Sequence, residues 1–220
     1  ELDYSRKDLW QYMAEVFLFW CRRGVDGFRC DAGYMVPAPA WEYITAKVRY
    51  EFPSTIFLLE GLGGKVSTTE RLITHCNLNW AYSEMFQNFD QDQMDWYIEE
   101  FQRISLPKGP LVNFSETHDN KRLAAVSKEF SRLRNGITAL LSDTGTFAIT
   151  CGVEWFASEK IDVHHLTSLK WGNPDNQVEY IKKLNNILKS HPTFLNAFTL
   201  VRMHTSHCNS IAYLRHSQDI

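Results

Sequence analysis

Strand-like and helix-like segments alternate along most of this chain. One short β-prone run ends at Asp31 within the stretch 24–32, further runs occupy positions 55–59, 79–83, 110–115 and 146–151, and amphipathic helical patterns separate most of them. Two successive runs are spaced by roughly 30 residues, which is the length of one strand–helix unit. Such alternation is typical of parallel strands joined by helical crossovers. The pattern therefore predicts an α/β fold built on a parallel sheet.

A carboxylate, Asp31, stands at the end of one of these runs, and others follow the ends of further runs, at Glu60, Asp119 and Glu154. The carboxyl ends of the strands of a (β/α)8 TIM barrel form its catalytic face. An open doubly wound sheet shares the same alternation. However, no glycine-rich phosphate fingerprint follows any strand-like run here. Charged residues at four strand exits therefore favour the barrel.

The chain contains too few strand-like runs for a whole barrel. Five are recognisable where eight are needed, so we expect only the later strands, about the fourth to the eighth, within residues 1–196. From position 198 the helical pattern gives way to short β-like pieces, and 197–220 is predicted to begin a C-terminal all-β domain. An incomplete barrel leaves strand edges open. We therefore expect this truncated chain by itself to be inactive.

Composition excludes some classes of protein. The formal net charge is -3 and 22% of residues are charged, which does not suggest nucleic-acid binding. The longest apolar stretch, 16–20, is far too short to cross a membrane. Five scattered cysteines without metal-ligand spacing indicate free thiols in a reducing compartment. These features predict a cytoplasmic protein and leave its oligomeric state open.

Arg29 and Asp31 are the first candidate pair. Side chains alternate along a strand, so these two point the same way and Cys30 points the opposite way. A neighbouring guanidinium favours the ionised carboxylate, which suits a nucleophile. The alternative interpretation is that Arg29 and Asp31 form only a structural salt bridge at the end of the strand.

Glu60 and Asp119 are the second and third candidates. Glu60 ends the apolar run 55–59 and precedes a glycine-rich loop, while His118 and Asp119 follow the run 110–115. Glu60 has an alternative reading as the cap of the next helix. The His118–Asp119 pair has an alternative reading as a polar turn.

Several carboxylates facing one cavity suggest two chemistries. One is cleavage of a glycosidic bond by a nucleophile and an acid/base pair. The other is a barrel lyase that holds a divalent metal ion. Arg29 discriminates between them, because a guanidinium beside Asp31 would repel a metal ion bound there. No lysine ends any of these strands to serve as the base of a lyase.

Four motifs carry a resemblance to a known family. The chain resembles the α-amylase family, glycoside hydrolase family 13, at GFRCDA (27–32), LLEG (58–61), FSETHDN (114–120) and CGVE (151–154). The segment LDYS (2–5) is similar to the part of the family that precedes the nucleophile strand. The motifs occur in the family's order along nearly the whole chain.

The resemblance implies a retaining α-glucan hydrolase or transglycosylase acting on α-1,4 or α-1,6 bonds. Asp31 would be the nucleophile, Glu60 the acid/base and Asp119 the transition-state stabiliser. Arg29 and His118 would bind the reacting sugar of an α-glucan or maltooligosaccharide. The chemistry requires no cofactor, and no metal-binding residues are assigned.

The chain also departs from the family pattern. The family's first motif, which often contributes to calcium binding, has no counterpart here, so the sequence leaves calcium dependence open. Tyr34 and Met35 stand where many α-amylases carry Lys-His, and the loop 61–64 after Glu60 is unusually glycine-rich. We expect acceptor sugars to bind there, with Tyr34 as a substrate-binding residue. The alternative is a non-catalytic remnant or a carbohydrate-binding module, although Asp31, Glu60 and Asp119 are all present.

Overall fold

The computed structural model describes residues 2–88, 90–142, 146–195, 198–207 and 210–217. Their backbone divides into two compact units. The first comprises Glu1–Ser83 and Ile104–Leu111, and the second comprises Glu84–Arg103 and Val112–Ile220. None of the helices among the described residues is long and apolar enough to cross a membrane.

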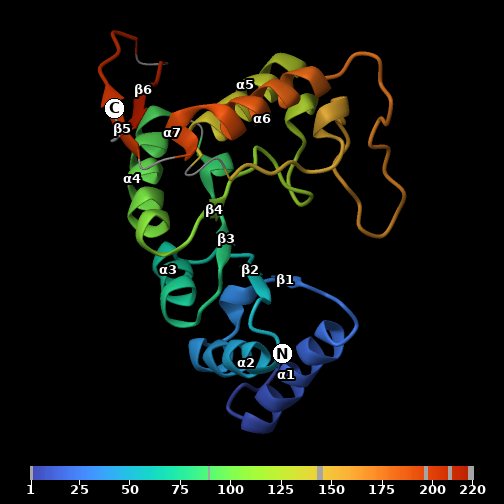
Figure 1. Cartoon of the computed structure of the whole chain (residues 1–220). Helices are drawn as coiled ribbons and strands as arrows, with labels where there is room; N and C mark the ends of the chain where they lie inside the picture. The colour runs from blue at the N-terminus through green and yellow to red at the C-terminus, as the bar shows by residue number, and fades with distance from the viewer. Residues whose placement is uncertain (1, 89, 143–145, 196–197, 208–209, 218–220) are drawn as a thin grey trace. The chain divides into compact units, whose positions relative to one another are not determined.

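The first unit alternates helices and strands, as the sequence predicts (Figure 1). Strand β1 pairs in parallel with β2, and β2 pairs in parallel with β3. The sheet order is β1-β2-β3-β4, where β4 is Leu111–Val112, so strands that follow one another in the chain are neighbours in the sheet. The elements are α1 (Lys7–Cys21), β1 (Gly27–Cys30), the 3-10 helix η1 (Gly33–Met35), α2 (Ala38–Glu51), β2 (Ile56–Leu59), α3 (Val66–His75) and β3 (Trp80–Tyr82).

Local sequence signals set the ends of these elements. Gly24 adopts a positive φ of 91° in the turn between α1 and β1, a conformation that glycine reaches without steric cost. Helix α2 starts directly after Pro37, and Pro39 lies in its first turn, where a missing backbone N–H costs no hydrogen bond. Gly24 thus marks the end of α1, and Pro37 marks the start of α2.

Aromatic rings join the sheet of the first unit to its helices. Phe17 on α1 packs against Phe28 of β1 and Phe57 of β2, with ring centroids 4.8 and 5.5 Å apart. Trp41 on α2 completes the cluster at 6.2 Å from Phe17. Phe28 and Phe57 are register partners and share this face of the sheet. The opposite face therefore carries Arg29 and its neighbours.

Replacing Phe57 by Ala should destabilise the protein strongly. Phe57 is fully buried, so truncation leaves a cavity among Phe17, Phe28 and Arg49, whose guanidinium lies 5.2 Å from the ring. We expect a loss of about 3–5 kcal/mol in the free energy of unfolding, measured by urea denaturation of the natural protein that contains this sequence. The matched control is Tyr50→Ala on exposed surface of α2, which should change stability by less than about 0.5 kcal/mol. Equal losses in both variants would contradict this packing.

The second unit continues with helices around a shorter strand. Helix α5 packs on α6 through a core of Ala139, Leu184, Leu188 and Phe194. The elements are η2 (Met85–Gln87), α4 (Gln91–Lys108), β4 (Leu111–Val112), η3 (Leu123–Ala125), α5 (Lys128–Leu140), η4 (Val153–Trp155), α6 (Val178–Ser190) and α7 (Pro192–Leu195). Helix α4 and strand β4 each cross the boundary between the units.

The fourth and fifth predicted strands are shorter than expected. The run 110–115 forms only Leu111–Val112, and the run 146–151 contributes an isolated parallel bridge between Asn113 and Phe147. Around that bridge, Asn113 N–H donates to the Thr146 carbonyl at 3.0 Å, and Ala148 N–H donates to the Asn113 carbonyl at 2.8 Å. The parallel pairing predicted for this segment is present, but over fewer residues.

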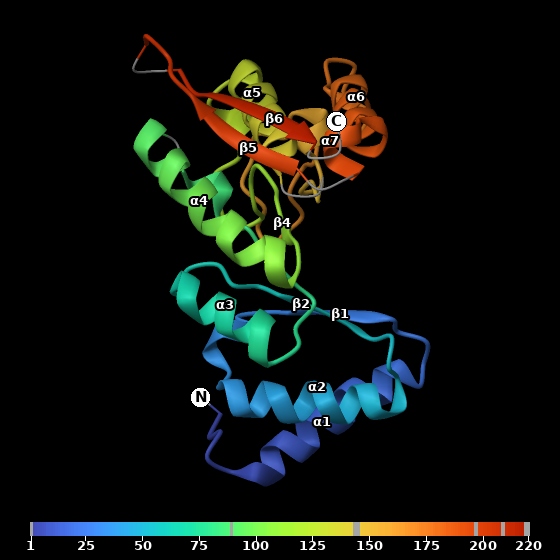
Figure 2. The same cartoon turned by 60° about the vertical axis from the view of Figure 1, so that its left-hand side comes forward.

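The chain ends in a hairpin of β5 (Phe198–Met203) and β6 (Ala212–Ser217), which pair in antiparallel fashion (Figure 2). Arg202 of β5 donates Nε–H to both carboxylate oxygens of Asp95 on α4, at 2.8 and 2.9 Å. Tyr213 of β6 donates its hydroxyl to the same carboxylate, and burial together with that bond raises the Tyr213 pKa. The hairpin matches the β-like pieces expected there, and the predicted domain boundary at 196/197 lies outside the described residues.

Candidate active site

The first two candidate carboxylates leave the sheet at the same edge. Cys30 and Leu59 are register partners at the carboxyl ends of β1 and β2, and Asp31 and Glu60 follow them directly. Glu60 N–H donates to the Cys30 carbonyl at 3.1 Å, which continues the pairing past the last strand residue. The exits of neighbouring parallel strands thus bring Asp31 and Glu60 together, as the sequence predicts.

Arg29 lies between the two carboxylates. Its Nη1 donates to Asp31 Oδ1, and its Nη2 lies 3.5 Å from Glu60 Oε2. Tyr82 at the end of β3 approaches the same guanidinium, with its ring centroid 5.6 Å away. Partial burial opposes the charged form, but hydrogen bonds to Asp31 and Tyr82 and the nearby Glu60 outweigh it and raise the Arg29 pKa. The single positive charge of Arg29 therefore interacts with both carboxylates.

Asp31 and Glu60 differ sharply in their access to solvent. The Asp31 side chain is 78% exposed, whereas that of Glu60 is 14% exposed. Glu60 Oε2 also accepts a hydrogen bond of 2.6 Å from Ala32 N–H. Ala32 adopts the left-handed conformation with φ 44°, which is strained for a residue with a side chain. This strained turn directs the Ala32 amide toward Glu60 and leaves Asp31 open to a ligand.

Cys30, between Arg29 and Asp31, faces away from the two acids. It is buried, and burial raises the pKa of its thiol to about 12. A thiol with such a pKa is a poor nucleophile at neutral pH. Of the two neighbours, Asp31 is thus the candidate nucleophile.

Tyr34 lies in η1, directly beyond the turn at Ala32. Its ring packs on the glycine-rich loop after Glu60, where a Cβ placed on Gly64 would come within 3.3 Å of the ring. Gly63 adopts a positive φ of 81° in the same loop. The absence of a side chain at Gly64 therefore leaves room for the Tyr34 ring against the loop that follows Glu60. This places Tyr34 near Glu60, and its substrate contact stays a prediction.

His118 and Asp119 follow β4 in the second unit. His118 Nε2 lies 3.4 Å from Asp119 Oδ2, and both side chains are exposed. Asp119 N–H donates to Thr117 Oγ1 at 3.1 Å, which shapes the turn. The structure thus presents these two predicted residues side by side on an exposed loop.

Two residues near that loop were not identified as candidates from the sequence. Glu116 and Arg122 form a buried ion pair, with Nε and Oε1 2.5 Å apart. Burial raises the Glu116 pKa, and the Arg122 guanidinium and the Leu123 amide only partly offset this. Glu116 lies inside the motif 114–120, as a charged residue between an apolar strand and a helix. That position is the feature of the sequence that could have identified Glu116 as a candidate.

The fourth carboxylate, Glu154, is engaged locally. Its Oε2 accepts a hydrogen bond of 3.0 Å from Gly152 N–H, two residues earlier in the chain. Glu154 therefore closes its own turn. Among the described residues, no group of three or more His, Cys, Asp or Glu side chains is arranged to hold a metal ion.

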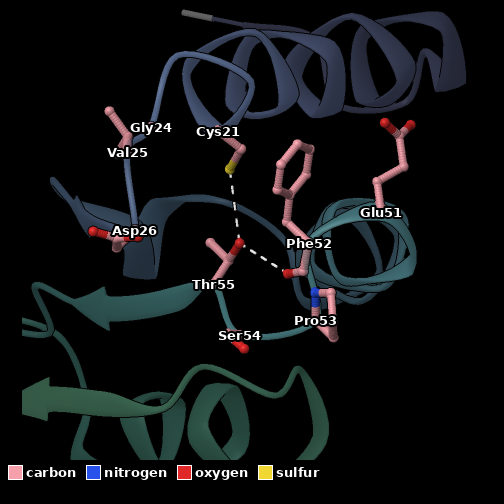
Figure 3. A pocket seen from close by; sticks show the side chains of 9 residues that line it. All are labelled: Cys21, Gly24, Val25, Asp26, Glu51, Phe52, Pro53, Ser54 and Thr55. Atoms are coloured by element: carbon pink, nitrogen blue, oxygen red, sulfur yellow. Dashed lines mark hydrogen bonds between the residues drawn. The ribbon is translucent and has the colours of Figure 1, made fainter.

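A pocket lies at the amino ends of the strands (Figure 3). Its lining includes Cys21, Asp26, Glu51 and Thr55. Thr55 donates to the Phe52 carbonyl at 2.9 Å and lies 3.7 Å from Cys21 Sγ, so its hydroxyl is already bonded inside the protein. This pocket is at the opposite end of β1 and β2 from Asp31 and Glu60.

The chain is similar to known proteins both in sequence and in fold. No family model matches the chain. It is 23% identical to an alpha-1,4-glucan:maltose-1-phosphate maltosyltransferase of Methylacidiphilum infernorum and 26% identical to one of Cereibacter sphaeroides, over 86% and 96% of this chain. An alpha-amylase from Geobacillus thermoleovorans, solved with acarbose, matches 99% of the chain with a TM-score of 0.77 at 16% identity. The chain spans 30% and 37% of the two sequence relatives and 52% of the solved chain.

Fold and site together define a class of protein. The chain is part of a (β/α)8 barrel that carries acidic side chains at the carboxyl ends of its strands. The chain is similar to these maltosyltransferases in sequence and to this alpha-amylase in fold, which supports the resemblance to the α-amylase family, glycoside hydrolase family 13, that the four motifs predict.

Proposed function

We propose that the protein containing this chain is a retaining enzyme acting on α-1,4 or α-1,6 bonds of α-glucans. The observation that carries the proposal is the arrangement of Arg29 between Asp31 and Glu60 at the ends of two neighbouring strands. A retaining mechanism needs one ionised carboxylate and one acid close together. Asp31, which is exposed, and Glu60, which is sheltered from solvent, lie at neighbouring strand ends and are the two carboxyl groups proposed for these roles.

In the proposed reaction, Asp31 attacks the anomeric carbon of the sugar. The bond from that carbon to the leaving oxygen breaks, and Glu60 gives its proton to that oxygen. A covalent glycosyl-enzyme intermediate forms. Glu60, now ionised, then takes a proton from water or from an acceptor sugar hydroxyl, whose oxygen attacks the anomeric carbon and releases Asp31. Arg29 donates a hydrogen bond to the Asp31 carboxylate and so helps to hold it in place for the first step.

The remaining site residues are assigned by the motif 114–120 and by position. Asp119 is proposed to bind sugar hydroxyls more tightly in the transition state than in the ground state. His118 and Tyr34 are proposed to contact the bound sugar. The exposure of His118 and Asp119 on one loop supports this assignment, as does the packing of Tyr34 against the loop after Glu60.

Transfer to a sugar is the favoured second step. Both named sequence relatives are maltosyltransferases, and the departures from the amylase pattern, Tyr34 and the loop 61–64, lie beside Glu60. Whether water or a sugar accepts the glycosyl group depends on such loops. No cofactor is needed for either outcome. We further propose that the 197–220 segment begins a separate β domain and, from the free thiols, that the protein is cytoplasmic.

The proposal is tested with the natural protein that contains this sequence. Maltooligosaccharides of one length are incubated with it, and products are resolved by chain length while new reducing ends are counted. Shorter products with new reducing ends indicate hydrolysis, whereas longer and shorter products without new reducing ends indicate transfer. If all glucans stay unchanged, the remnant or binding-module alternative replaces the proposal.

Replacing Arg29 by Met should impair this reaction. The variant removes the positive charge shared by Asp31 and Glu60, and we expect kcat/KM to fall on the order of 10²-fold. Arg29→Lys keeps the positive charge but loses the simultaneous contact of a guanidinium with both carboxylates. Its kcat/KM should therefore lie between the values of Arg29→Met and the wild type. The matched control is Arg22→Met, which removes a surface ion pair with Glu51. An Arg29→Met enzyme as active as Arg22→Met would contradict the role of Arg29.

A further inference from the structure

The exposed loop that carries Asp119 is closed at its base by the buried ion pair of Glu116 and Arg122. The Glu116 and Arg122 side chains are 2% and 0% exposed. One Glu116 oxygen accepts from Arg122 Nε at 2.5 Å, and the other accepts from Leu123 N–H at 2.7 Å. The chain enters the loop at Glu116 and leaves it at Arg122, so one carboxylate joins its two ends.

The base of this loop is also attached to the segment before η4. Thr150 Oγ1 donates to the Glu116 carbonyl at 2.6 Å, and Arg122 Nη2 donates to the Cys151 carbonyl at 3.0 Å. Gly152 has a positive φ of 91°, and a Cβ placed there would come within 3.3 Å of Arg122 Nη2. The segment 150–152 therefore fits closely around the guanidinium and limits its movement.

The contacts between the two ends are local to the loop: Thr117 is buried and bonds to the Asn120 side chain. His118 and Asp119 are exposed, and Thr117 shapes the turn through its contact with the Asp119 amide. The orientation of such a loop is set mainly by its base. A displacement of about 1 Å in a reacting group can cost on the order of 10²-fold in rate. A rigid base is thus a requirement for any precise role of Asp119.

A buried ion pair is a costly way to gain stability alone. Removing both charges from water is unfavourable, and apolar side chains of similar volume are often as stabilising. Charged groups do provide several directional hydrogen bonds at fixed geometry. Here they make contacts to Leu123 and Cys151 that apolar side chains could not make.

We propose that Glu116 and Arg122 are positioning residues, which hold the loop 117–121 so that Asp119 presents its carboxylate to the sugar in the transition state. This inference rests on the proposed function. It predicts that loss of the pair lowers kcat while substrate binding in the ground state changes little, because Asp119 acts chiefly in the transition state.

The main test is the double variant Glu116→Met/Arg122→Met in the natural protein. Because the pair is replaced as a unit, the fold should be kept, which thermal unfolding checks. We expect kcat to fall on the order of 10²-fold, with KM changing by less than about threefold. The matched control is Glu179→Met/Lys182→Met, which removes an exposed ion pair on α6 and should leave both constants unchanged. A folded double variant with wild-type kcat would overturn the proposal.

A double-mutant cycle with Asp119→Asn separates positioning from a general structural effect. If the pair acts through Asp119, then Asp119→Asn should lower kcat much less in the Glu116→Met/Arg122→Met background than in the wild type. Full additivity of the two losses would overturn the proposal. Thr150→Val supplies a milder variant, since it removes only the hydrogen bond to the Glu116 carbonyl, and it should show a smaller fall in kcat with the same KM.

Backbone hydrogen exchange tests the same proposal without relying on activity. Amides of the loop 117–121 should exchange faster in the double variant and in Thr150→Val, while amides of α6 should not change. Unchanged exchange in the loop would overturn the positioning role. If the wild-type protein lacks activity on α-glucans, the proposed function fails by itself, and exchange still decides whether the pair orders the loop.

Discussion

Replacing Asp31 by Asn is expected to reduce kcat/KM on maltooligosaccharides on the order of 10⁴-fold or more, because the amide oxygen is a poor nucleophile. The fold should be kept, since Asp31 is exposed and Arg29 retains its contact with Glu60. Initial rates of product formation measure the effect. The matched control is Asp26→Asn, an exposed carboxylate at the amino end of β1, which should be as active as the wild type.

The stereochemistry of rescue makes this test sharper. In Asp31→Ala, added azide can occupy the space of the lost carboxylate and attack an activated aryl α-glucoside directly. A single displacement inverts the anomeric centre, so a β-glucosyl azide is expected. A retained α-product, or an Asp31→Asn enzyme with more than about a tenth of the wild-type rate, would contradict the assignment of Asp31 as nucleophile.

Replacing Glu60 by Gln should have the second-largest effect, and its size should depend on the leaving group. For oligosaccharides, whose leaving oxygen needs a proton, we expect kcat/KM to fall roughly 10²–10⁴-fold. For an activated substrate such as maltosyl fluoride, the bond-breaking step should be much less affected. The amide oxygen of Gln can still accept the hydrogen bond from Ala32 N–H, so local structure is retained.

Azide also identifies the acid/base. In Glu60→Gln it should attack the covalent intermediate on Asp31 without needing a base, and the double displacement should yield an α-glycosyl azide. Glu51→Gln, a partly exposed glutamate at the end of α2, provides the control and should keep wild-type activity. An equal loss on both kinds of substrate would show that Glu60 has only a structural role.

The sequence alone determined the order of elements in the first unit. Apolar periodicity and the turn residues Gly24, Pro37 and Pro39 predicted the helices and strands there, because these signals act between residues close in the chain. Alternation along β1 also predicted that Arg29 and Asp31 share a face, and their contact confirms it. The run 146–151 was predicted as a strand and forms only the bridge at Phe147, because local β-propensity does not determine how many partners the sheet supplies.

Only the tertiary structure decided which side chains meet. Register between β1 and β2 brings Glu60 to the Arg29 guanidinium, and the left-handed turn at Ala32 points a backbone amide at the same carboxylate. The packing of Tyr34 on Gly64 and the pairing of Glu116 with Arg122 were likewise decided by the fold, because the sequence shows these residues but not that they meet. Periodicity is a property of neighbours in the chain, whereas burial and hydrogen bonding across strands depend on how separate segments pack. The sequence could therefore name the acids, and the fold determined the charges and contacts that surround each of them.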